Sequence, residues 1–279
     1  MQDEVVVLEN ISKQGLFKNQ KNTIYVMNPS GEGALLSINN QDGTVVQASP
    51  WSMLAYDQEF KDLVRSNSIT SIHYEREFDY LFLMNSNSGS FRIFKGLERP
   101  VMVNSMTMNS PYSLSCNTHT REILVCCSQS KKIAILDLEG KYKRIIHLSG
   151  VTLEPRGIMV KNNLEILVCD SIGRKVDVYD MNGAIKKSLG QGLIQFPFQI
   201  MTNDDGYICV HGEWQGENFF TFLDPGGELV LEKVIRSPNG DSMACIICFD
   251  FDTETRIYNF TFNTRCQDKL TMRFCFGKF

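Results

Sequence analysis

The stretch EILVCCS at residues 122–128 returns as EILVCDS at residues 165–171, which begins 43 residues after the first copy. The residues that follow each stretch are also alike. Each copy consists of an apolar run, a polar loop, an alternating run, an Asp-x-x-Gly turn and a second apolar run. This pattern predicts four short β-strands joined by turns. A repeat of this length indicates one supersecondary unit that the chain uses several times.

Glycine marks one turn of the repeat in three consecutive copies. Gly140, Gly183 and Gly227 follow one another at intervals of 43 and 44 residues. Each is expected at a turn position with positive φ, a conformation that glycine adopts without a steric penalty. The three copies, which cover residues 111–235, therefore predict the same succession of strands and turns.

Weaker copies carry the repeat along the rest of the chain, at residues 24–28, 81–85 and 257–260. The longest interval between copies holds an insertion at about residues 51–67, whose pattern is typical of a helix rather than a strand. The last position of the repeated strand falls, in successive copies, at Asn28, Asn85, Cys127, Asp170 and Gly212.

Six units of four strands predict an all-β fold, a six-bladed β-propeller of antiparallel blades. A single blade cannot bury both faces of its sheet, so the blades must stack around an axis and close a ring. We expect residues 4–8 to close the ring as the outer strand of the last blade, paired with residues 272–275. The chain is thus predicted to be a single domain over residues 1–279.

Composition agrees with one closed domain. The 279 residues are 43% hydrophobic, and no Pro/Ser-rich linker or low-complexity tract divides them. The nine cysteines are an odd number and lie mostly in predicted strands, which favours buried, reduced thiols and a cytoplasmic location. No apolar run approaches the length of a membrane span, and the sequence has no signal-peptide pattern.

The copy that begins at residue 154 resembles the NHL repeat. The motifs Pro-x-Gly-Ile and Ile-x-Val-x-Asp-Ser of that repeat match PRGI at residues 155–158 and ILVCDS at residues 166–171. The order of blades is similar to that of the C-terminal propellers of TRIM-NHL proteins. The resemblance implies a recognition module, because several members of that family bind single-stranded RNA on one face and others bind proteins. Cys127 and Gly212 depart from the pattern, since the repeat has Asp there.

Strand order decides which loops share a rim of a propeller. Loops that enter the first strand of each blade, and loops that join its second and third strands, lie together on what we call the first rim. The turns of the opposite rim carry mainly acidic residues, with Lys161 and Arg256 among the basic exceptions. On the first rim, basic residues gather on the third and fourth blades: Lys131, Lys132, Arg156, Arg174 and Lys175. Such a local basic patch can hold a polyanion although the net charge of the chain is −4.

Aromatic side chains accompany these basic residues. Tyr112 and Phe198 each follow a proline directly, as Arg156 does. The prolines recur at intervals of 44 and 42 residues, so the three side chains are expected at neighbouring points of the first rim. Single-stranded RNA is recognised by such groups, because bases stack on the planar side chains and phosphates pair with the charges. The predicted RNA-binding residues are Tyr112, Lys131, Lys132, Arg156, Arg174, Lys175 and Phe198.

Two other readings stay open. An aromatic residue at the start of an inner strand can simply plug the central channel, and charged pairs in turns are commonly solvated loop residues. A protein partner is the alternative ligand, with Trp214 as an exposed anchor and Glu213 beside it. Neither a membrane nor DNA is expected as a partner.

Catalysis is not predicted. Metal-dependent enzymes on six-bladed propellers need inward-facing His or carboxylate ligands, whereas the four histidines of this chain, at residues 73, 119, 147 and 211, do not share one position in the blade. A serine-nucleophile motif and a phosphate-binding glycine loop are absent from the sequence. Cys245 and Cys248 have the spacing of a metal clip, but on a strand they face opposite sides. We therefore predict a non-enzyme without metal or cofactor.

Overall fold

The structure is a computed structural model of the 279 residues. It describes residues 16–18, 23–27, 34–39, 45–50, 71–75, 77–86, 88–96, 101–148, 152–161, 164–203, 205–215, 217–235, 244–252, 257–263 and 269–275. The predicted closing strand at residues 4–8 and the predicted insertion at residues 51–67 lie outside these ranges. No helix in the described part of the chain has the length and hydropathy of a membrane span.

The chain divides into two compact units. Unit 1 consists of Met1–Asn85, Arg92–Val103 and Asn239–Phe279, and unit 2 of Ser86–Phe91 and Asn104–Pro238. The prediction of a single domain over residues 1–279 stays a prediction. Each unit is described by itself below.

Unit 1 contains two sheets and most of a third. The first sheet has the order β1 (Leu16–Lys18), β2 (Thr23–Met27), β3 (Ala34–Asn39) and β4 (Val45–Pro50). The sheet most of which belongs to this unit has the order β5 (Ser71–Glu75), β6 (Tyr80–Asn85), β7 (Ser90–Lys95) and β8 (Val101–Thr107). Three described strands form the last sheet: β21 (Ala244–Asp252), β22 (Ile257–Asn263) and β23 (Lys269–Cys275).

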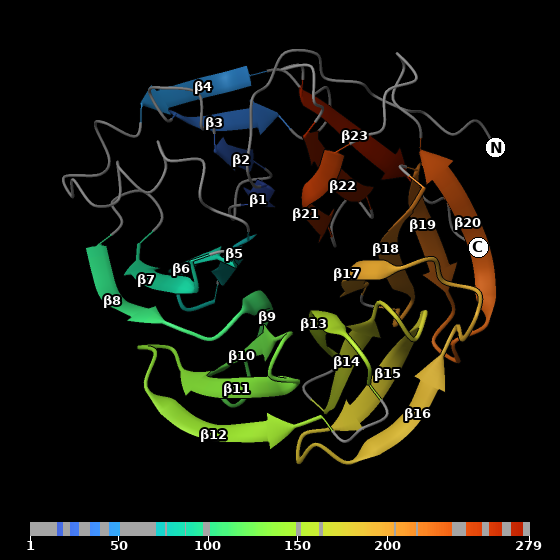
Figure 1. The fold of residues 1–279 in the computed structure, drawn as a ribbon. Helices are drawn as coiled ribbons and strands as arrows, with labels where there is room; N and C mark the ends of the chain where they lie inside the picture. The colour runs from blue at the N-terminus through green and yellow to red at the C-terminus, as the bar shows by residue number, and fades with distance from the viewer. Residues whose placement is uncertain are drawn as a thin grey trace. The chain divides into compact units, whose positions relative to one another are not determined.

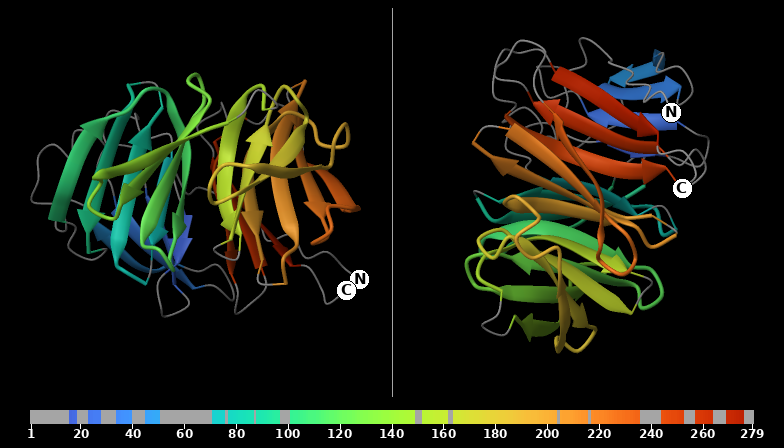
Figure 2. Two further views of the ribbon diagram at one scale, coloured as in Figure 1. Left: turned by 90° about the horizontal axis from the view of Figure 1, so that it is seen from below. Right: turned by 90° about the vertical axis from the view of Figure 1, so that its right-hand side faces the viewer.

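Unit 2 contains three complete four-stranded antiparallel sheets, which are the three strongest copies of the repeat (Figure 1). The first comprises β9 (Pro111–Asn117), β10 (Glu122–Cys127), β11 (Lys132–Asp137) and β12 (Tyr142–His147). The second comprises β13 (Pro155–Lys161), β14 (Glu165–Asp170), β15 (Lys175–Asp180) and β16 (Ile185–Leu189). The third comprises β17 (Pro197–Thr202), β18 (Ile208–Trp214), β19 (Glu217–Leu223) and β20 (Leu229–Ile235). The strands of each sheet run side by side with their turns at the two ends (Figure 2). Four strands for each of these copies is the predicted arrangement, and it is confirmed.

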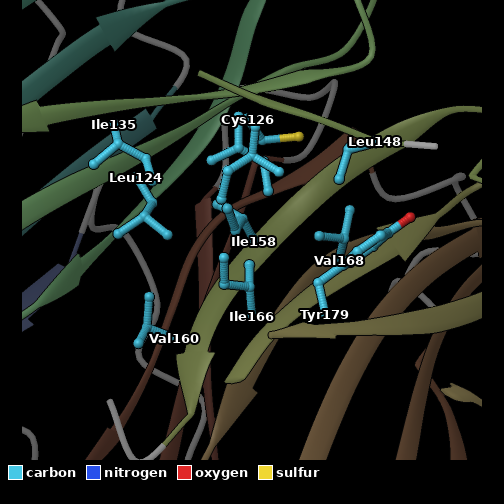
Figure 3. Close-up of a cluster of buried hydrophobic side chains, with 11 residues drawn as sticks. Leu124, Cys126, Ile135, Leu148, Ile158, Val160, Ile166, Val168 and Tyr179 are labelled. Carbon is cyan, nitrogen blue, oxygen red and sulfur yellow. The ribbon is translucent and has the colours of Figure 1, made fainter. Parts of the chain in front are cut away.

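Both faces of the middle sheet are buried, which explains why β14 is apolar at every position from Ile166 to Cys169. Ile166 and Val168 pack against Leu124 and Cys126 of β10, in the cluster of Figure 3. The alternate residues of β14 point to the other side and join a second cluster with residues of β17 and β18. Alternation is a property of any strand, so an entirely apolar strand indicates that both sides of the sheet are covered. The free thiols of Cys126, Cys127, Cys169 and Cys209 are buried in these strands, as predicted.

The Asp-x-x-Gly turns have the predicted geometry. Gly140, Gly183 and Gly227 have φ values of 84°, 90° and 100°. In the middle copy, Oδ1 of Asp180 accepts hydrogen bonds from the backbone N–H groups of Asn182 at 2.9 Å and Ala184 at 2.8 Å. These bonds, that from Ala184 first, hold the pKa of Asp180 below its ordinary value. The aspartate therefore organises the turn, and the glycine supplies the backbone conformation that closes it.

Candidate binding edge

The three prolines predicted to share a rim lie at corresponding ends of the three sheets of unit 2. Pro111, Pro155 and Pro197 open β9, β13 and β17. Each pairs with a residue at or near the end of the following strand, so the next turn of the sheet lies at the same edge. We call this edge of unit 2 the proline edge: residues 110–112, 128–132, 152–156, 171–175, 190–198 and 212–215.

Tyr112, Arg156 and Phe198 come together at the proline edge. The guanidinium carbon of Arg156 lies 5.1 Å from the centre of the Tyr112 ring and 4.4 Å from the centre of the Phe198 ring. Nη1 of Arg156 donates a hydrogen bond to the hydroxyl of Tyr112 at 3.2 Å, and Nη2 donates one to Oε1 of Glu154 at 3.0 Å. The proline spacing predicted neighbouring positions, and the structure places the three side chains in contact. Arg156 therefore already lies against both rings, and its positive charge is paired with Glu154.

Gly157 allows the strands that carry Arg156 and Phe198 to approach each other. A Cβ atom on Gly157 would lie 2.8 Å from the carbonyl oxygen of Phe198, so only glycine lets β13 and β17 approach this closely. On the other side, the hydroxyl of Ser113 donates a hydrogen bond to the carbonyl oxygen of Arg156 at 2.7 Å. The backbone that carries Arg156 is thus held between β9 and β17.

Lys175 is not the exposed base that the sequence predicted. Its side chain is buried, and Nζ lies 2.8 Å from Oδ1 of Asp177 and 4.0 Å from Oδ2 of Asp170. Asp177 also accepts hydrogen bonds from the hydroxyls of Thr152 at 2.7 Å and Ser188 at 2.6 Å. Because two buried carboxylates neutralise the ammonium group, Lys175 stabilises the sheet and does not offer a charge to a ligand.

The other basic candidates remain at the surface. Lys131 is exposed and ends the turn between β10 and β11, and Lys132 is half-buried and begins β11. Arg174 has the corresponding place between β14 and β15, and its Nη2 donates a hydrogen bond to Oε1 of Gln195 at 2.6 Å. The basic surface is therefore smaller than the sequence predicted.

The hydrogen bonds of Asp170 show why the repeat has an aspartate at this position. Its carboxylate is fully buried and accepts hydrogen bonds from the backbone N–H groups of Leu153, Glu154 and Gly173, at 2.9, 2.9 and 3.0 Å. These bonds fix both the turn before β13 and the turn after β14. At the corresponding place in the next sheet, a Cβ on Gly212 would overlap the carbonyl oxygen of Gln195. Gly212 thus departs from the repeat because the backbone of residues 195–196 occupies the space.

The sequence analysis missed a row of apolar side chains at the proline edge. Leu153, Ile172 and Leu193 are 47%, 56% and 46% exposed. Ile172 stands alone among polar and glycine residues in a turn, and this isolation is the signal that could have revealed it. Leu153 and Leu193 have apolar residues close by in the sequence, so no such signal marks them. Trp214, the predicted protein anchor, is 42% exposed and stacks on Phe196 with ring centres 4.6 Å apart and an interplanar angle of 7°. The proline edge is therefore more apolar and less basic than predicted.

Glu213 and the described histidines complete the predicted candidates. Glu213 is half-buried beside Trp214, and its backbone N–H donates to the carbonyl oxygen of Phe196 at 3.3 Å. His211 is buried, and its Nε2 donates to Oδ1 of Asn218 at 2.8 Å. Burial lowers the pKa of His211 to about 4, so the ring is neutral at neutral pH. His119 and His147 lie at opposite ends of the first sheet of unit 2.

Lys161, which the sequence places on the opposite edge, ends β13 and is buried. Burial is also the first cause that lowers its pKa. Two acidic residues of that edge are paired across strands: Nζ of Lys143 lies 3.2 Å from Oε1 of Glu122, and Nζ of Lys186 lies 3.0 Å from Oε1 of Glu165.

Comparison with known proteins identifies the fold. No protein-family model matches the chain, and no curated protein does. Among solved structures, the selenomethionine form of virginiamycin B lyase from Staphylococcus aureus is 12% identical, with a TM-score of 0.64 over 97% of this chain and 99% of the lyase. A catalytically inactive variant of that lyase with quinupristin is 10% identical, with a TM-score of 0.58 over 98% and 100%.

Hydrazine synthase from Kuenenia stuttgartiensis is 15% identical, with a TM-score of 0.57 over 71% of this chain. The match covers 56% of the length of that protein. These neighbours have β-propeller folds, so the chain has a fold of the β-propeller type. At such low identity the likeness extends to the fold alone. Both proteins are enzymes, so the absence of catalysis stays a prediction for this chain.

Proposed function

We propose that the chain is a six-bladed, NHL-like propeller that acts as a non-catalytic recognition module and binds a protein partner at the proline edge. The repeat supports the blade number, because the described strands fall into six sheets that follow its copies. The NHL-like motifs of residues 155–158 and 166–171 support the relation to that repeat. The observation that carries the function is the row of exposed apolar side chains.

Exposed apolar residues on turns point to a protein ligand. Leu153, Ile172 and Leu193 surround one end of the middle sheet, and two backbone hydrogen bonds join their turns: Ser171 N–H to Glu154 O at 3.0 Å, and Gly192 N–H to Arg174 O at 3.1 Å. Exposed large apolar groups that lie together are typical of interaction sites. Trp is enriched among the residues that dominate binding energy in protein interfaces.

Single-stranded RNA is the second candidate, and the stack of Tyr112, Arg156 and Phe198 favours it. Planar side chains at neighbouring positions are the platform on which bases stack. However, Arg156 lies against both rings and is paired with Glu154, and Lys175 is buried. Few charges therefore remain for phosphates, and an apolar contact describes this edge better than a phosphate-binding strip.

The test compares substitutions at the two edges of unit 2. A variant with Leu153, Ile172 and Leu193 replaced by Ser should retain less than about a tenth of the partner protein that the wild type retains from a native extract, because apolar anchors carry most of an interface's energy. The matched control replaces Leu164 and Ile185, which are exposed aliphatic residues outside the proline edge, and should retain the partner. Both variants should melt near the wild-type temperature, because the substituted side chains are exposed.

RNA is examined with the same proteins. If a pool of single-stranded RNAs binds at low salt, if the serine variant binds it normally, and if exchanging Lys131, Lys132 and Arg174 for Glu abolishes binding, RNA replaces the protein partner as the function.

A further inference from the structure

We infer that the partner presents an extended peptide segment that places alternate apolar side chains on Leu153, Ile172 and Leu193 and acidic side chains beside Lys131, Lys132 and Arg174. This inference rests on the proposed function and names the chemistry of the ligand.

The spacing of the three aliphatic residues fits an extended chain. Leu153 precedes β13, Ile172 lies in the turn between β14 and β15, and Leu193 lies in the connection after β16, next to Gly192, whose N–H donates to Arg174 O of that turn. Neighbouring strands lie roughly 4.8 Å apart, so the segments that carry Leu153 and Ile172 lie within roughly two strand spacings of each other. Side chains i, i+2 and i+4 of an extended peptide follow one another at roughly 7 Å on one face. A peptide that crosses the sheet's edge can therefore contact all three residues at once.

The edge is rigid where the peptide would lie. Thr152 is fully buried and donates to Asp177, and the N–H groups of Leu153 and Glu154 both donate to Asp170. The backbone at Leu153 is thus fixed, and the side chain is exposed. On the neighbouring turn, the N–H of Gly173 donates to the same carboxylate, which fixes Ile172 as well. A site that is already ordered loses little entropy on binding.

The charges at the proline edge favour a ligand with negative charge. The acidic side chains next to Leu153 and Ile172 are already engaged: Glu154 pairs with Arg156 and accepts from Ser171, and Asp170 is buried beside Lys175. Within the described residues, no ion pair involves Lys131, Lys132 or Arg174. Positive charges without a carboxylate partner favour acidic residues in the ligand.

The charge pattern also gives the ligand an orientation. Glu213 near the end of β18 and Glu217 at the start of β19 lie beside Trp214, so this end of the third sheet is acidic. The acidic residues of the peptide should therefore lie toward the starts of β11 and β15, where Lys131, Lys132 and Arg174 lie.

A peptide display experiment tests the inference. Random peptides of about twelve residues, which would span roughly 40 Å when extended, are selected on the full chain and counter-selected on the variant with Ser at 153, 172 and 193. The enriched peptides should carry apolar residues at alternate positions and an excess of Asp and Glu. The variant with Glu at 131, 132 and 174 should bind the same peptides at least about tenfold more weakly, as expected for reversal of complementary charges.

The outcomes separate the inference from the proposed function. Peptides that depend on Ile172 but have no acidic excess, and that bind the charge-reversed variant equally well, would overturn the inference and leave the protein-binding function intact. If no peptide distinguishes the wild type from the serine variant while a folded partner protein does, the extended segment is wrong and the function again stands. If neither ligand distinguishes them, both are wrong.

Discussion

Replacing Gly212 by alanine is expected to lower the free energy of unfolding by about 3 kcal/mol or more, or to prevent folding. The new Cβ would overlap the carbonyl oxygen of Gln195 and lie 2.9 Å from that of Phe196. Both are backbone atoms, so no side-chain rotation can relieve the overlap. The chain before β17 would have to move, which would break the hydrogen bond from Glu213 N–H to Phe196 O. Urea-induced unfolding followed by tryptophan fluorescence measures the loss.

Gly192→Ala is the matched control for this substitution. Gly192 lies in the same connection before β17 and has a φ of 77°, but nothing lies within 4 Å of the position of its Cβ. Its replacement should cost only the backbone strain, about 1 kcal/mol. Equal losses for the two variants would contradict the close backbone approach at Gly212.

Replacing Asp177 by alanine should cost about 3 to 5 kcal/mol, the range observed when one partner of a buried ion pair is removed. Lys175 would keep a buried ammonium group with Asp170 at 4.0 Å, and the hydroxyls of Thr152 and Ser188 would lose an acceptor. Chemical denaturation at neutral pH measures the change.

The control for Asp177 is an ion pair at the surface. Lys186→Ala removes the 3.0 Å contact with Glu165, in which the lysine side chain is 46% exposed, and should cost less than about 1 kcal/mol. A combined replacement of Lys175 by Met and Asp177 by Leu should recover part of the loss, because no buried ammonium group is then left without Asp177, and Asp170 keeps its three backbone hydrogen bonds. If Asp177→Ala costs no more than Lys186→Ala, Asp177 does not stabilise the buried ammonium group of Lys175.

The strands and turns of unit 2 could be predicted because the repeat shows them locally. Three local patterns predict positions along a strand: the apolar runs, the Asp-x-x-Gly turns and the interval between prolines. Alternation then predicts the face of the sheet on which a side chain lies. The same reasoning could have corrected Lys175. It stands two residues before Asp177 on β15, so the two side chains share a face, and a strand with both faces buried leaves such a lysine no route to solvent.

Other parts of the site depend on distances between sheets, which a sequence does not contain. The intervals between prolines placed Tyr112, Arg156 and Phe198 at neighbouring points, but they could not show that the arginine lies against both rings. Likewise, an isolated Ile172 in a polar turn is compatible with burial until the neighbouring turns are in place. Its exposure follows from the turn held by Asp170.

The salt dependence of ligand binding distinguishes an apolar contact at the proline edge from contacts to phosphates. The affinities of the wild type and of Ile172→Arg for the bound ligand, whether partner protein or RNA, are measured between about 50 mM and about 200 mM salt. Contacts to many phosphates would weaken by about 10³-fold or more over this range. We predict a change of less than about tenfold with salt and a loss of more than about tenfold for Ile172→Arg, since the apolar row provides most of the energy. A steep salt dependence together with unchanged binding by Ile172→Arg would contradict a protein-binding proline edge.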